Sequence, residues 1–441
     1  MSFVKRILLS WKTTLTLVLL ILTIIIIGYI FPQRVSSTVR ELETWRQAHP
    51  VLSPLVQRTG LDHVYSTVWF ALLLFVTMLS LALSSFEQIK AANKKTFGLR
   101  GGDFTLQRKG DVLESTATLD ELSKALKSEG YLRIAHNEQV HRFVKYPWGY
   151  WGNALLHAGM LVAIGASLTI VLTQQSGVIK LYEGEVFPHG GSWGLQDNGV
   201  LADNLELPGA LRLENVTPEF WETDDVKQVT TEFSLIDSAD HAEKFKLSIN
   251  QILNYKGIRI YQQSFGHAFF VEFTDRASRV IPVVLLMESQ SQRDKPSYGS
   301  FRFKEIPFEI KAKYFADAEK KSMDGKNPLF VMRLLDHDHV VGEAELKVGE
   351  RGVIGDYTVR LLRVSRWVGL IFTVTPGMSG LYLAFFIIIL GAALSYFTPP
   401  REFVVTSVDD VLLVKWRGTR FAELYRDEYE RIAVAFCNKH M

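Results

Sequence analysis

The chain alternates between long apolar runs and long stretches of mixed polarity. A helix needs about 20 mostly apolar residues to cross the hydrocarbon core of a bilayer. Four segments meet that length, and they run from Thr13 to Phe31, from Val68 to Phe86, from Tyr150 to Leu172 and from Gly380 to Phe397. The pattern therefore predicts four transmembrane helices.

The first apolar run resembles a secretory signal but differs from one in two respects. Its apolar part is longer than the roughly 7–15 residues of a signal core. It also continues into FPQR at 31–34 without a small-residue cleavage site. We interpret this run as an uncleaved membrane anchor.

The two longest polar stretches differ in their periodicity. Residues 98–147 contain one helix-like run, TLDELSKALKSEGYL, flanked by short strand-like runs, which predicts a small α+β unit. Residues 174–378 contain a succession of short runs rich in β-branched and aromatic residues, such as FKLSINQIL and AFFVEF, separated by turn residues. This spacing predicts an antiparallel β-sandwich or barrel-like domain.

Together these patterns predict a polytopic α-helical membrane protein with a large extracytoplasmic mainly-β domain and a small cytoplasmic α+β insert. The expected domains are transmembrane helices 1 and 2 with a short outer loop at 1–97, the insert at 98–147, transmembrane helix 3 at 148–173, the β-rich domain at 174–378, transmembrane helix 4 at 379–398 and a cytoplasmic tail at 399–441.

Composition agrees with a membrane protein that has aqueous domains. Of the 441 residues, 47% are hydrophobic and 22% are charged, which is too apolar for an ordinary soluble protein and too charged for one lying wholly in lipid. The net charge of +2 gives no global indication of a nucleic-acid partner. The single cysteine, Cys437, excludes an internal disulfide, a CxxC redox pair and a thiolate metal cluster.

Basic residues gather in three places, and these set the expected orientation. The three groups are Lys5, Arg6 and Lys12; Lys90, Lys94, Lys95, Arg100, Arg108 and Lys109; and Arg401, Lys415, Arg417 and Arg420. With four spans, all three groups lie on one side, and the positive-inside rule makes that side the cytoplasm. We expect a multi-pass protein of the bacterial inner membrane, or of the thylakoid as its plastid equivalent, with both termini cytoplasmic.

One imidazole lies inside the third apolar run. His157 is about two turns from the cytoplasmic end, and ionisable residues at such depth usually face the protein interior or a functional cavity. Two interpretations stay open: a neutral imidazole packed against a neighbouring helix, or an axial ligand to a porphyrin iron. Small residues nearby permit close approach of a helix or of a flat ring. They are Gly152, Ala154, Ala158, Gly159, Ala163 and Gly165.

Four other histidines are weaker candidates. His337 and His339 stand in the sequence DHDH, which could bind a divalent metal, but no third ligand is identifiable and we favour a polar hairpin tip. His49 and His63 lie between the first two spans, and we favour solvated residues over interfacial ligands. The sequence contains no G-x-S-x-G, P-loop, H-E-x-x-H or dinucleotide fingerprint, so a self-contained hydrolase or nucleotide-driven enzyme is unsupported.

Several passages together resemble the ResB (CcsB) family of cytochrome c biogenesis. They are GYIFPQ, LDHVYSTVWFALLLFVTMLSLALSS, VHRFVKYPWGYWGNALLHAGMLVAIGASL, LSINQILNYKGIRIYQQSFG and TPGMSGLYLAFFIIILGAALS. The resemblance covers the chain almost from end to end and keeps the order of two spans, an insert, a third span, a large outer domain and a fourth span.

The resemblance implies a subunit of the System II cytochrome c synthase, a holocytochrome c synthase type lyase, and not an enzyme alone. Members of that family work with a polytopic ResC (CcsA)-type partner to move haem across the membrane and attach it to CxxCH motifs of apocytochrome c. The family's intramembrane histidine maps onto His157, which implies haem b as a transient cofactor. The partner supplies a tryptophan-rich haem motif, whereas the nine tryptophans here are scattered. An acidic residue expected ahead of Pro376-Gly377 is replaced by Thr375.

Stoichiometry adds one expectation. A haem held by two imidazoles needs two histidines at similar depth, and His157 is the one histidine within the four apolar runs. We expect the second ligand from the partner or from a second copy. For Tyr255, Gly257, Tyr261 and Gln262, in the passage NYKGIRIYQQSFG, we favour ordinary sheet and turn roles.

Two other classes of protein stay open. A non-catalytic membrane assembly scaffold, in which His157 only packs, predicts a tolerated His157→Gln substitution and complex formation unaffected by haem. A stand-alone b-type haem electron-transfer protein predicts tightly retained haem without any partner.

Overall fold

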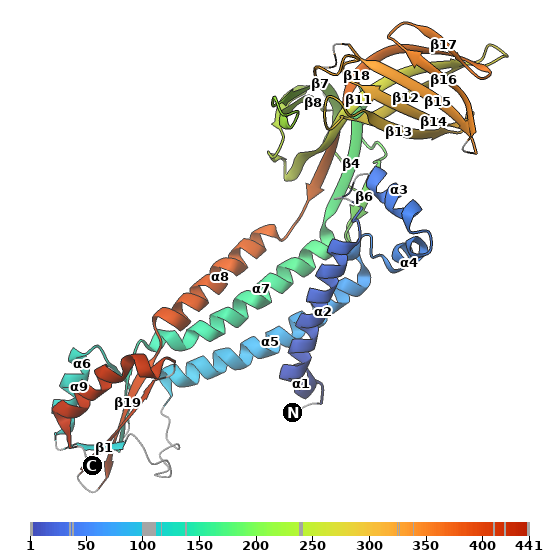
Figure 1. Cartoon of the computed structure of the whole chain (residues 1–441). Helices are drawn as coiled ribbons and strands as arrows, with labels where there is room; N and C mark the ends of the chain where they lie inside the picture. Colours follow the sequence, from blue (N-terminus) through green and yellow to red (C-terminus); the bar gives the residue numbers. More distant parts are fainter. Residues whose placement is uncertain are drawn as a thin grey trace. The chain divides into compact units, whose positions relative to one another are not determined.

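The computed structural model describes residues 3–34, 37, 39–98, 112–115, 117–136, 139–237, 241–323, 325, 327–337, 339–408, 411–418 and 420–438. The chain forms two compact units (Figure 1). The helical unit comprises 1–26, 67–172 and 376–441, and the β unit comprises 27–66 and 173–375. Each unit is built from segments that are distant in the sequence.

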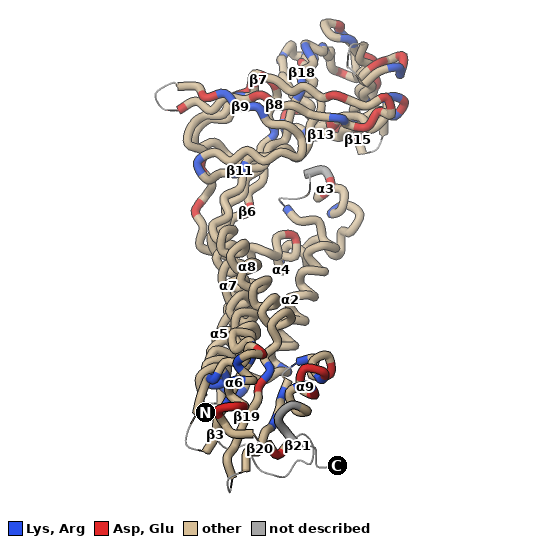
Figure 2. The backbone as a smooth tube through the Cα atoms, turned by 90° about the vertical axis from the view of Figure 1, so that its left-hand side faces the viewer, with Lys and Arg blue, Asp and Glu red and all other residues tan. Residues whose placement is uncertain are grey.

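Within the described part of the chain, four helices are long and apolar enough to cross a membrane. They are α2 (Trp11–Ile30), α5 (Val68–Phe97), α7 (Gly152–Thr173) and α8 (Met378–Phe397). The four predicted spans are confirmed as helices, and Figure 2 shows long stretches of them without charged residues. Helix α5 continues past Phe86 because the following residues, EQIKAANKKTF, are mostly good helix formers.

Helices α7 and α8 pack through glycines. A Cβ added to Gly159 would lie 2.6 Å from Ile388 Cγ1, and one added to Gly391 would lie 2.7 Å from the backbone nitrogen of Leu156. Gly152 meets Ser395 in the same way. Small residues let two backbones approach closely, which is how helices associate where lipid removes the hydrophobic driving force. These glycines therefore serve a helix contact.

The other face of α7 packs against α5. Phe70 and Leu74 from α5 and Leu168 and Val171 from α7 form a buried apolar cluster. Residues of α2, Ile21 among them, pack against this cluster. Helix α7 therefore lies between α5 and α8 within the helical unit.

The helical unit also contains a six-stranded antiparallel sheet, in the order β2-β3-β19-β20-β1-β21. Its strands are β1 (Val112–Ser115), β2 (Leu132–His136), β3 (Val140–Lys145), β19 (Arg401–Val408), β20 (Val411–Gly418) and β21 (Cys437–Asn438). Helices α6 (Leu119–Ser128) and α9 (Arg426–Phe436) contribute to its core with Leu122 and Ile432. Residues 399–441, treated above as a tail, thus supply strands to the same sheet as residues 112–145.

A buried ion pair ties this sheet to the helices. Arg142 on β3 donates from Nε and Nη2 to Glu402 Oε2 on β19 at 2.9 and 2.7 Å, and both side chains are almost fully buried. Arg142 also donates to the carbonyl of Gly98, which follows α5. The hydroxyl of Tyr150, in the 3-10 turn Pro147–Trp151 that begins the third span, donates to Glu402 at 3.2 Å.

The β unit contains three antiparallel sheets, which confirms the mainly-β prediction for this region. The largest holds β4 (Gln175–Tyr182), β6 (Leu195–Asn198), β10 (Leu253–Tyr255), β11 (Ile258–Thr274), β12 (Val280–Glu288), β17 (Arg351–Ile354) and β18 (Tyr357–Val374). A second holds β13 (Ser297–Phe303), β14 (Ile306–Phe315), β15 (Leu329–Asp336) and β16 (His339–Leu346), and a third holds β5 (Val186–Phe187), β7 (Ala210–Phe220), β8 (Val226–Ile236) and β9 (Ala242–Ser248).

Two long strands join two separate cores. Strands β11 and β18 pair along almost their whole lengths and pass through both parts of the β unit (Figure 1). The first half of β11, with Ile260, and the last half of β18, with Phe372, face a core shared with the β5-β7-β8-β9 sheet. The remaining halves, with Phe269 and Val359, face a core shared with the β13-β14-β15-β16 sheet. A break in register at Gln263 lies between the two cores.

The segment between the first two spans is also structured. It contains α3 (Val39–Ala48), α4 (Leu52–Thr59) and a 3-10 turn at Val64–Ser66, and it belongs to the β unit. Two further short elements lie among the described residues: α1 (Phe3–Leu8) before the first span and a 3-10 turn at Ala422–Tyr425 before α9.

Candidate functional site

His157 lies on α7 and faces α5. Its Nδ1 is 3.2 Å from the Oγ of Ser84 on α5, and the imidazole is half-buried. One turn away on both helices, the amide of Asn153 donates to Gln88 Oε1 at 2.8 Å. Because each pair is spaced by four residues on its helix, the two pairs lie along one seam between antiparallel helices.

The hydrogen bond with Ser84 is compatible with either neutral tautomer of the imidazole. An Nδ1–H that donates to the Ser84 hydroxyl leaves the lone pair of Nε2 uncommitted, and this is the form of histidine that ligates a metal. The donor chemistry of the seam therefore fits an iron porphyrin bound through His157 Nε2.

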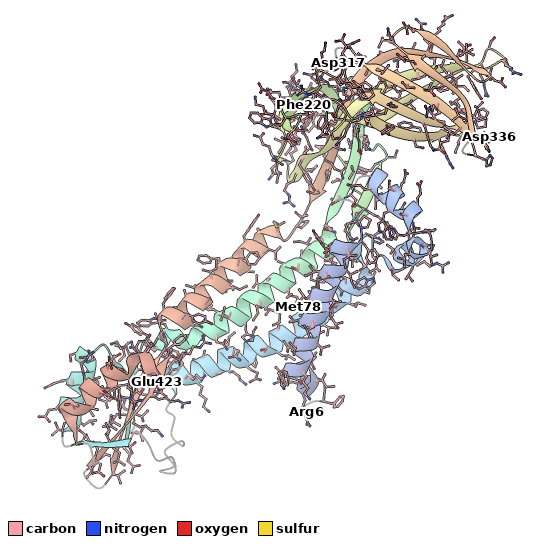
Figure 3. All side chains as sticks on the ribbon, viewed as in Figure 1. Arg6, Met78, Phe220, Asp317, Asp336 and Glu423 are labelled. Carbon is pink, nitrogen blue, oxygen red and sulfur yellow. The ribbon has the colours of Figure 1, made fainter. Side chains whose placement is uncertain are left out.

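Two glycines of α7 provide a contact with another helix and do not form a surface for haem. Gly152 and Gly159 contact α8, as described above, so the close approach they permit is that of a helix. Gly165 is the exception: among the described residues, a Cβ added to it would meet the sulfur of Met78 on α5 at 3.8 Å and nothing closer (Figure 3 labels Met78).

Sequence reasoning singled out His157 but missed its polar neighbours. The signal was present: Ser84 and Gln88 are four residues apart in the second run, and Asn153 and His157 are four residues apart in the third. Matching polar spacings in two apolar helices indicate a shared face.

The DHDH motif is a hairpin tip. Asp336 and His339 pair across the turn between β15 and β16, and Asp338 lies outside the described residues. His337 Nδ1 is 2.6 Å from Asp336 Oδ1, and the His337 side chain is 96% exposed (Figure 3 labels Asp336). Within the part of the chain that the structure describes, no cluster of three or more potential metal-ligating His, Cys, Asp or Glu side chains occurs. The pairing of β15 with β16 confirms the hairpin.

The two histidines between the first spans have different environments. His49 is exposed at the end of α3, where its ring stacks on Trp45 and its Nδ1 lies 3.0 Å from the Trp45 carbonyl. This agrees with the solvated interpretation. His63 is 24% exposed and its Nδ1 lies 2.7 Å from Asp62 Oδ1, so the solvated interpretation is wrong for His63.

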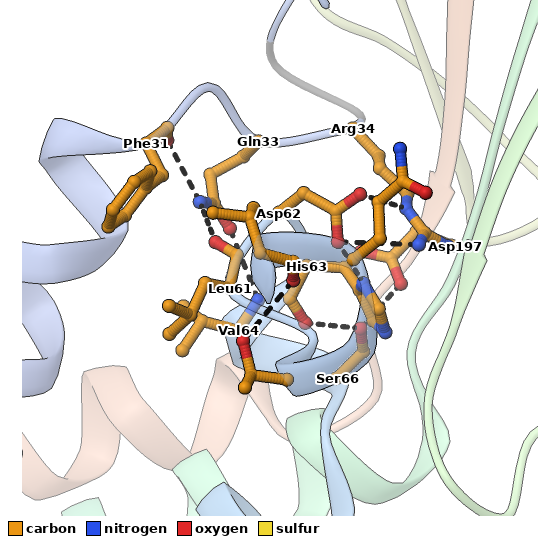
Figure 4. A network of polar contacts seen from close by, with 12 residues as sticks. Phe31, Gln33, Arg34, Leu61, Asp62, His63, Val64, Ser66 and Asp197 are labelled. Carbon is orange, nitrogen blue, oxygen red and sulfur yellow. Dashed lines mark hydrogen bonds and ion pairs between the residues drawn. The ribbon is translucent and has the colours of Figure 1, made fainter. Parts of the chain in front are cut away.

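Figure 4 shows the polar network around His63. Arg34 Nε donates to Asp62 at 2.9 Å, and Ser66 Oγ lies 2.5 Å from Asp197 Oδ1 on β6. Burial raises the pKa of Asp62, but the hydrogen bonds from His63 and Arg34 outweigh it and the pKa is lowered overall. Burial dominates at Asp197 and raises its pKa. The network holds the segment between the first spans against the β unit's largest sheet.

Cys437 belongs to β21 by its backbone, and its side chain lies outside what the structure describes.

Four apolar helices long enough to cross a membrane, an imidazole on the third of them and a large mainly-β region define a multi-pass membrane protein with folded domains outside the spans. The ResB-like family model matches residues 11–356, and the chain belongs to this family. The resemblance expected from the sequence is thus confirmed.

Two relatives show how far the similarity extends. The chain is 23% identical to a protein named cytochrome c biogenesis protein CcsB from Microcystis aeruginosa over 360 residues, which cover 79% of this chain and 76% of that one. It is 22% identical to a CcsB protein from Picosynechococcus over 412 residues, covering 90% of this chain and 84% of the relative.

Proposed function

We propose that this chain is a subunit of a System II cytochrome c synthase, which helps to carry haem across the membrane and presents it with apocytochrome c for covalent attachment. The names of the relatives support a role in cytochrome c biogenesis. The observation that carries the finer proposal is the imidazole of His157, held at Nδ1 by Ser84 between two apolar helices.

His157 holds haem b transiently in this proposal. Haem supplies the iron that becomes part of the cytochrome, so it is cargo here. Ser84 orients the imidazole, and the seam with Asn153 and Gln88 keeps α5 and α7 in register. The second axial ligand comes from a ResC (CcsA)-type partner or from a second copy. Because this chain contributes one of the two axial ligands, haem can leave the site again when the other ligand is withdrawn.

The proposed orientation places both termini in the cytoplasm of a bacterial inner membrane, or on the equivalent side of a thylakoid. The basic residues near the termini support it by the positive-inside rule. Strand pairing adds a second support: β3 and β19 are neighbours, so the segments before α7 and after α8 lie on one side of the bilayer. The chain crosses the bilayer twice between these segments, once through α7 and once through α8, and therefore returns to the same side.

Holocytochrome formation tests this function. The chain is co-expressed with a ResC-type partner and an apocytochrome c in a bacterial host without its own maturation system, and covalent haem is read by haem staining. We expect holocytochrome with the native chain and a loss of at least tenfold with His157→Ala. His337→Ala is the matched control, because that imidazole is exposed at a hairpin tip.

Each alternative predicts another result. Full maturation by the His157→Ala variant would indicate a scaffold that needs no ligand at this position. No maturation by the native chain, together with haem retained in the absence of the partner, would indicate a b-type electron carrier.

A further inference from the structure

The passage NYKGIRIYQQSFG builds two different faces of one sheet. It forms β10, a turn at Lys256-Gly257 and the first half of β11. Ile258 and Ile260 face the apolar core. Arg259 and Tyr261 alternate with them, so they lie on the opposite face, away from that core.

The opposite face carries a polar row that crosses four strands. Arg259 on β11 pairs with Thr373 on β18, Thr373 pairs with Ser176 on β4, and Ser176 pairs with Asp197 on β6. Residues directly opposite in antiparallel strands share a face. The next row on this face is more apolar and includes Tyr261 and its partner Ile371.

A cavity of about 650 Å³ lies over this face of the sheet. Its walls include Arg259, Tyr261 and Ile371 from the sheet, Ile252 beside β10, and Tyr65 from the segment between the first two spans. The volume is within the range of about 300–1,000 Å³ that is typical of small-ligand sites. The accessible surface of this chamber is mostly apolar, and the polar side chains of its lining include Asp197 and Thr373 besides Arg259.

Arg259 is the cation of this chamber. Among the described residues its guanidinium donates a hydrogen bond to the hydroxyl of Thr375 and forms no ion pair. Asp197 lies three strands away on the same row, about 14 Å at the usual spacing between strands, and it is bonded to Ser66. The charge of Arg259 is thus available to a ligand.

We propose that this chamber binds an apolar ligand that bears a carboxylate, with Arg259 holding the carboxylate and Tyr261, Ile371 and Ile252 contacting the apolar body. Two sources offer this chemistry: the propionates of haem and the headgroup of a fatty acid. A guanidinium matches a carboxylate through two parallel hydrogen bonds, which makes it the usual residue for this recognition. The assignment of the ligand to haem rests on the proposed function. The recognition of a carboxylate by Arg259 does not depend on it.

Connectivity supports access from the membrane. Four residues that line the chamber lie within three residues along the chain of an end of an apolar helix. They are Gln33 after α2, Tyr65 before α5, Gln174 after α7 and Thr375 before α8. The lining of the chamber is thus linked to all four apolar helices by short connections along the chain.

Binding to the full-length His157→Ala protein, in nanodiscs of phosphatidylcholine, tests the proposal without contribution from the helical site. The probes are haemin, haemin dimethyl ester and oleate. Binding of the haem probes is read by quenching of tryptophan fluorescence, to which Trp193 contributes because its ring contacts Gly177 on the core side of the same sheet. Oleate is read by its competition with the haem probes and by calorimetry.

We expect Arg259→Gln to weaken the affinity for at least one carboxylate probe about tenfold, and Arg259→Lys to weaken it less. The dimethyl ester has no carboxylate, so it should bind the native residue and Arg259→Gln equally weakly. Arg302→Gln is the control, because Arg302 is 81% exposed and pairs with Glu309. Thr375→Ala removes the internal partner of Arg259 and should leave the affinity unchanged or raise it.

The binding measurements distinguish haem from a fatty acid as the ligand. Arg259-dependent binding of haemin supports the site and assigns it to haem, and Arg259-dependent binding of oleate alone supports the site and assigns it to a fatty acid. Equal affinity of the native residue and Arg259→Gln for both probes would overturn the proposal. This result is independent of the maturation assay, which depends on His157.

Discussion

At the scale of single residues, the contact between the Ser84 hydroxyl and His157 Nδ1 bears directly on the proposed haem ligation. A residue that bonds the far nitrogen of a ligating imidazole fixes its tautomer and raises its basicity. His157 itself was predictable from the energetic cost of an imidazole in an apolar run. Ser84 was not, because serine is common in membrane helices and only the pairing of α5 with α7 gives it a role.

Ser84→Ala should weaken haem retention by the complex with its partner about tenfold and shift its absorption maximum, without abolishing ligation. The measurement is a haem titration of the purified complex. Ser85→Ala is the matched control on the adjacent residue, since its hydroxyl has no hydrogen-bond partner among the described residues. Identical affinities for the two variants would remove Ser84 from the site.

His267 makes the stability of the β unit depend on pH. It lies on β11 beside Tyr314, and burial, with a smaller effect of Arg366, lowers its pKa to about 4. The unfolded chain binds a proton below about pH 6.5 and the folded chain does not, so stability is complete above that pH and falls between about pH 6.5 and 4.

The expected loss across this window is about 3 kcal/mol, measured as the fall in the thermal unfolding midpoint of the native chain. His267→Gln should flatten this part of the profile, whereas the exposed His337→Gln should not. A midpoint that falls equally in all three proteins would assign the pH dependence to other groups.

At the scale of elements, glycines determine which helices touch. Sequence reasoning predicted that the small residues of α7 permit the approach of a helix or a flat ring, and the pattern could not choose between them. The choice depends on the rotation of α7, which the contacts with α8 on one side and α5 on the other fix together.

Gly159→Ala should destabilise the α7–α8 pair by about 1–3 kcal/mol. Its Cβ would lie 2.6 Å from Ile388 Cγ1 and 3.1 Å from the Ala384 carbonyl, and the backbone cannot move aside as a flexible side chain would. Thermal stability in detergent measures the effect. Gly165→Ala, on the same helix with Met78 Sδ at 3.8 Å, should be nearly neutral, and equal losses in both variants would contradict the packing described.

The sheet of the helical unit was predictable only in part. The helix-like run over 118–132 contains α6, where Thr118 and Glu121 form a capping box. The partnership of β3 with β19 was not visible, because more than 250 residues separate Arg142 from Glu402. Local periodicity indicates a strand but carries no information about its partner.

Glu402→Gln should destabilise this sheet by about 3–5 kcal/mol, because it leaves the buried guanidinium of Arg142 without a counter-charge. Limited proteolysis of the region around α6 and α9 reports the change as faster cleavage. Glu423→Gln is the control, since its pairing with Arg426 is solvent-exposed (Figure 3 labels Glu423). Unchanged cleavage in the Glu402 variant would show that the pair contributes little.

At the scale of the whole molecule, the chain crosses between its two units at each apolar helix. The segments that flank the helices pair with partners of the same unit, as β3 does with β19 and as Ser66 does with Asp197. An even number of crossings satisfies both pairings, in agreement with four spans. The four long apolar helices could be predicted from hydropathy alone, whereas the division of the chain into two interleaved units required the long-range contacts.

The central claim is that His157 ligates haem within the membrane. Its most direct test is the reduced-minus-oxidised absorption spectrum of the purified complex with a ResC-type partner, recorded for the native chain and for His157→Ala. We expect a bis-imidazole haem spectrum from the native complex and its loss in the variant. A spectrum that survives the substitution, or a native complex that purifies without haem, would contradict the claim and make His157 a packing residue.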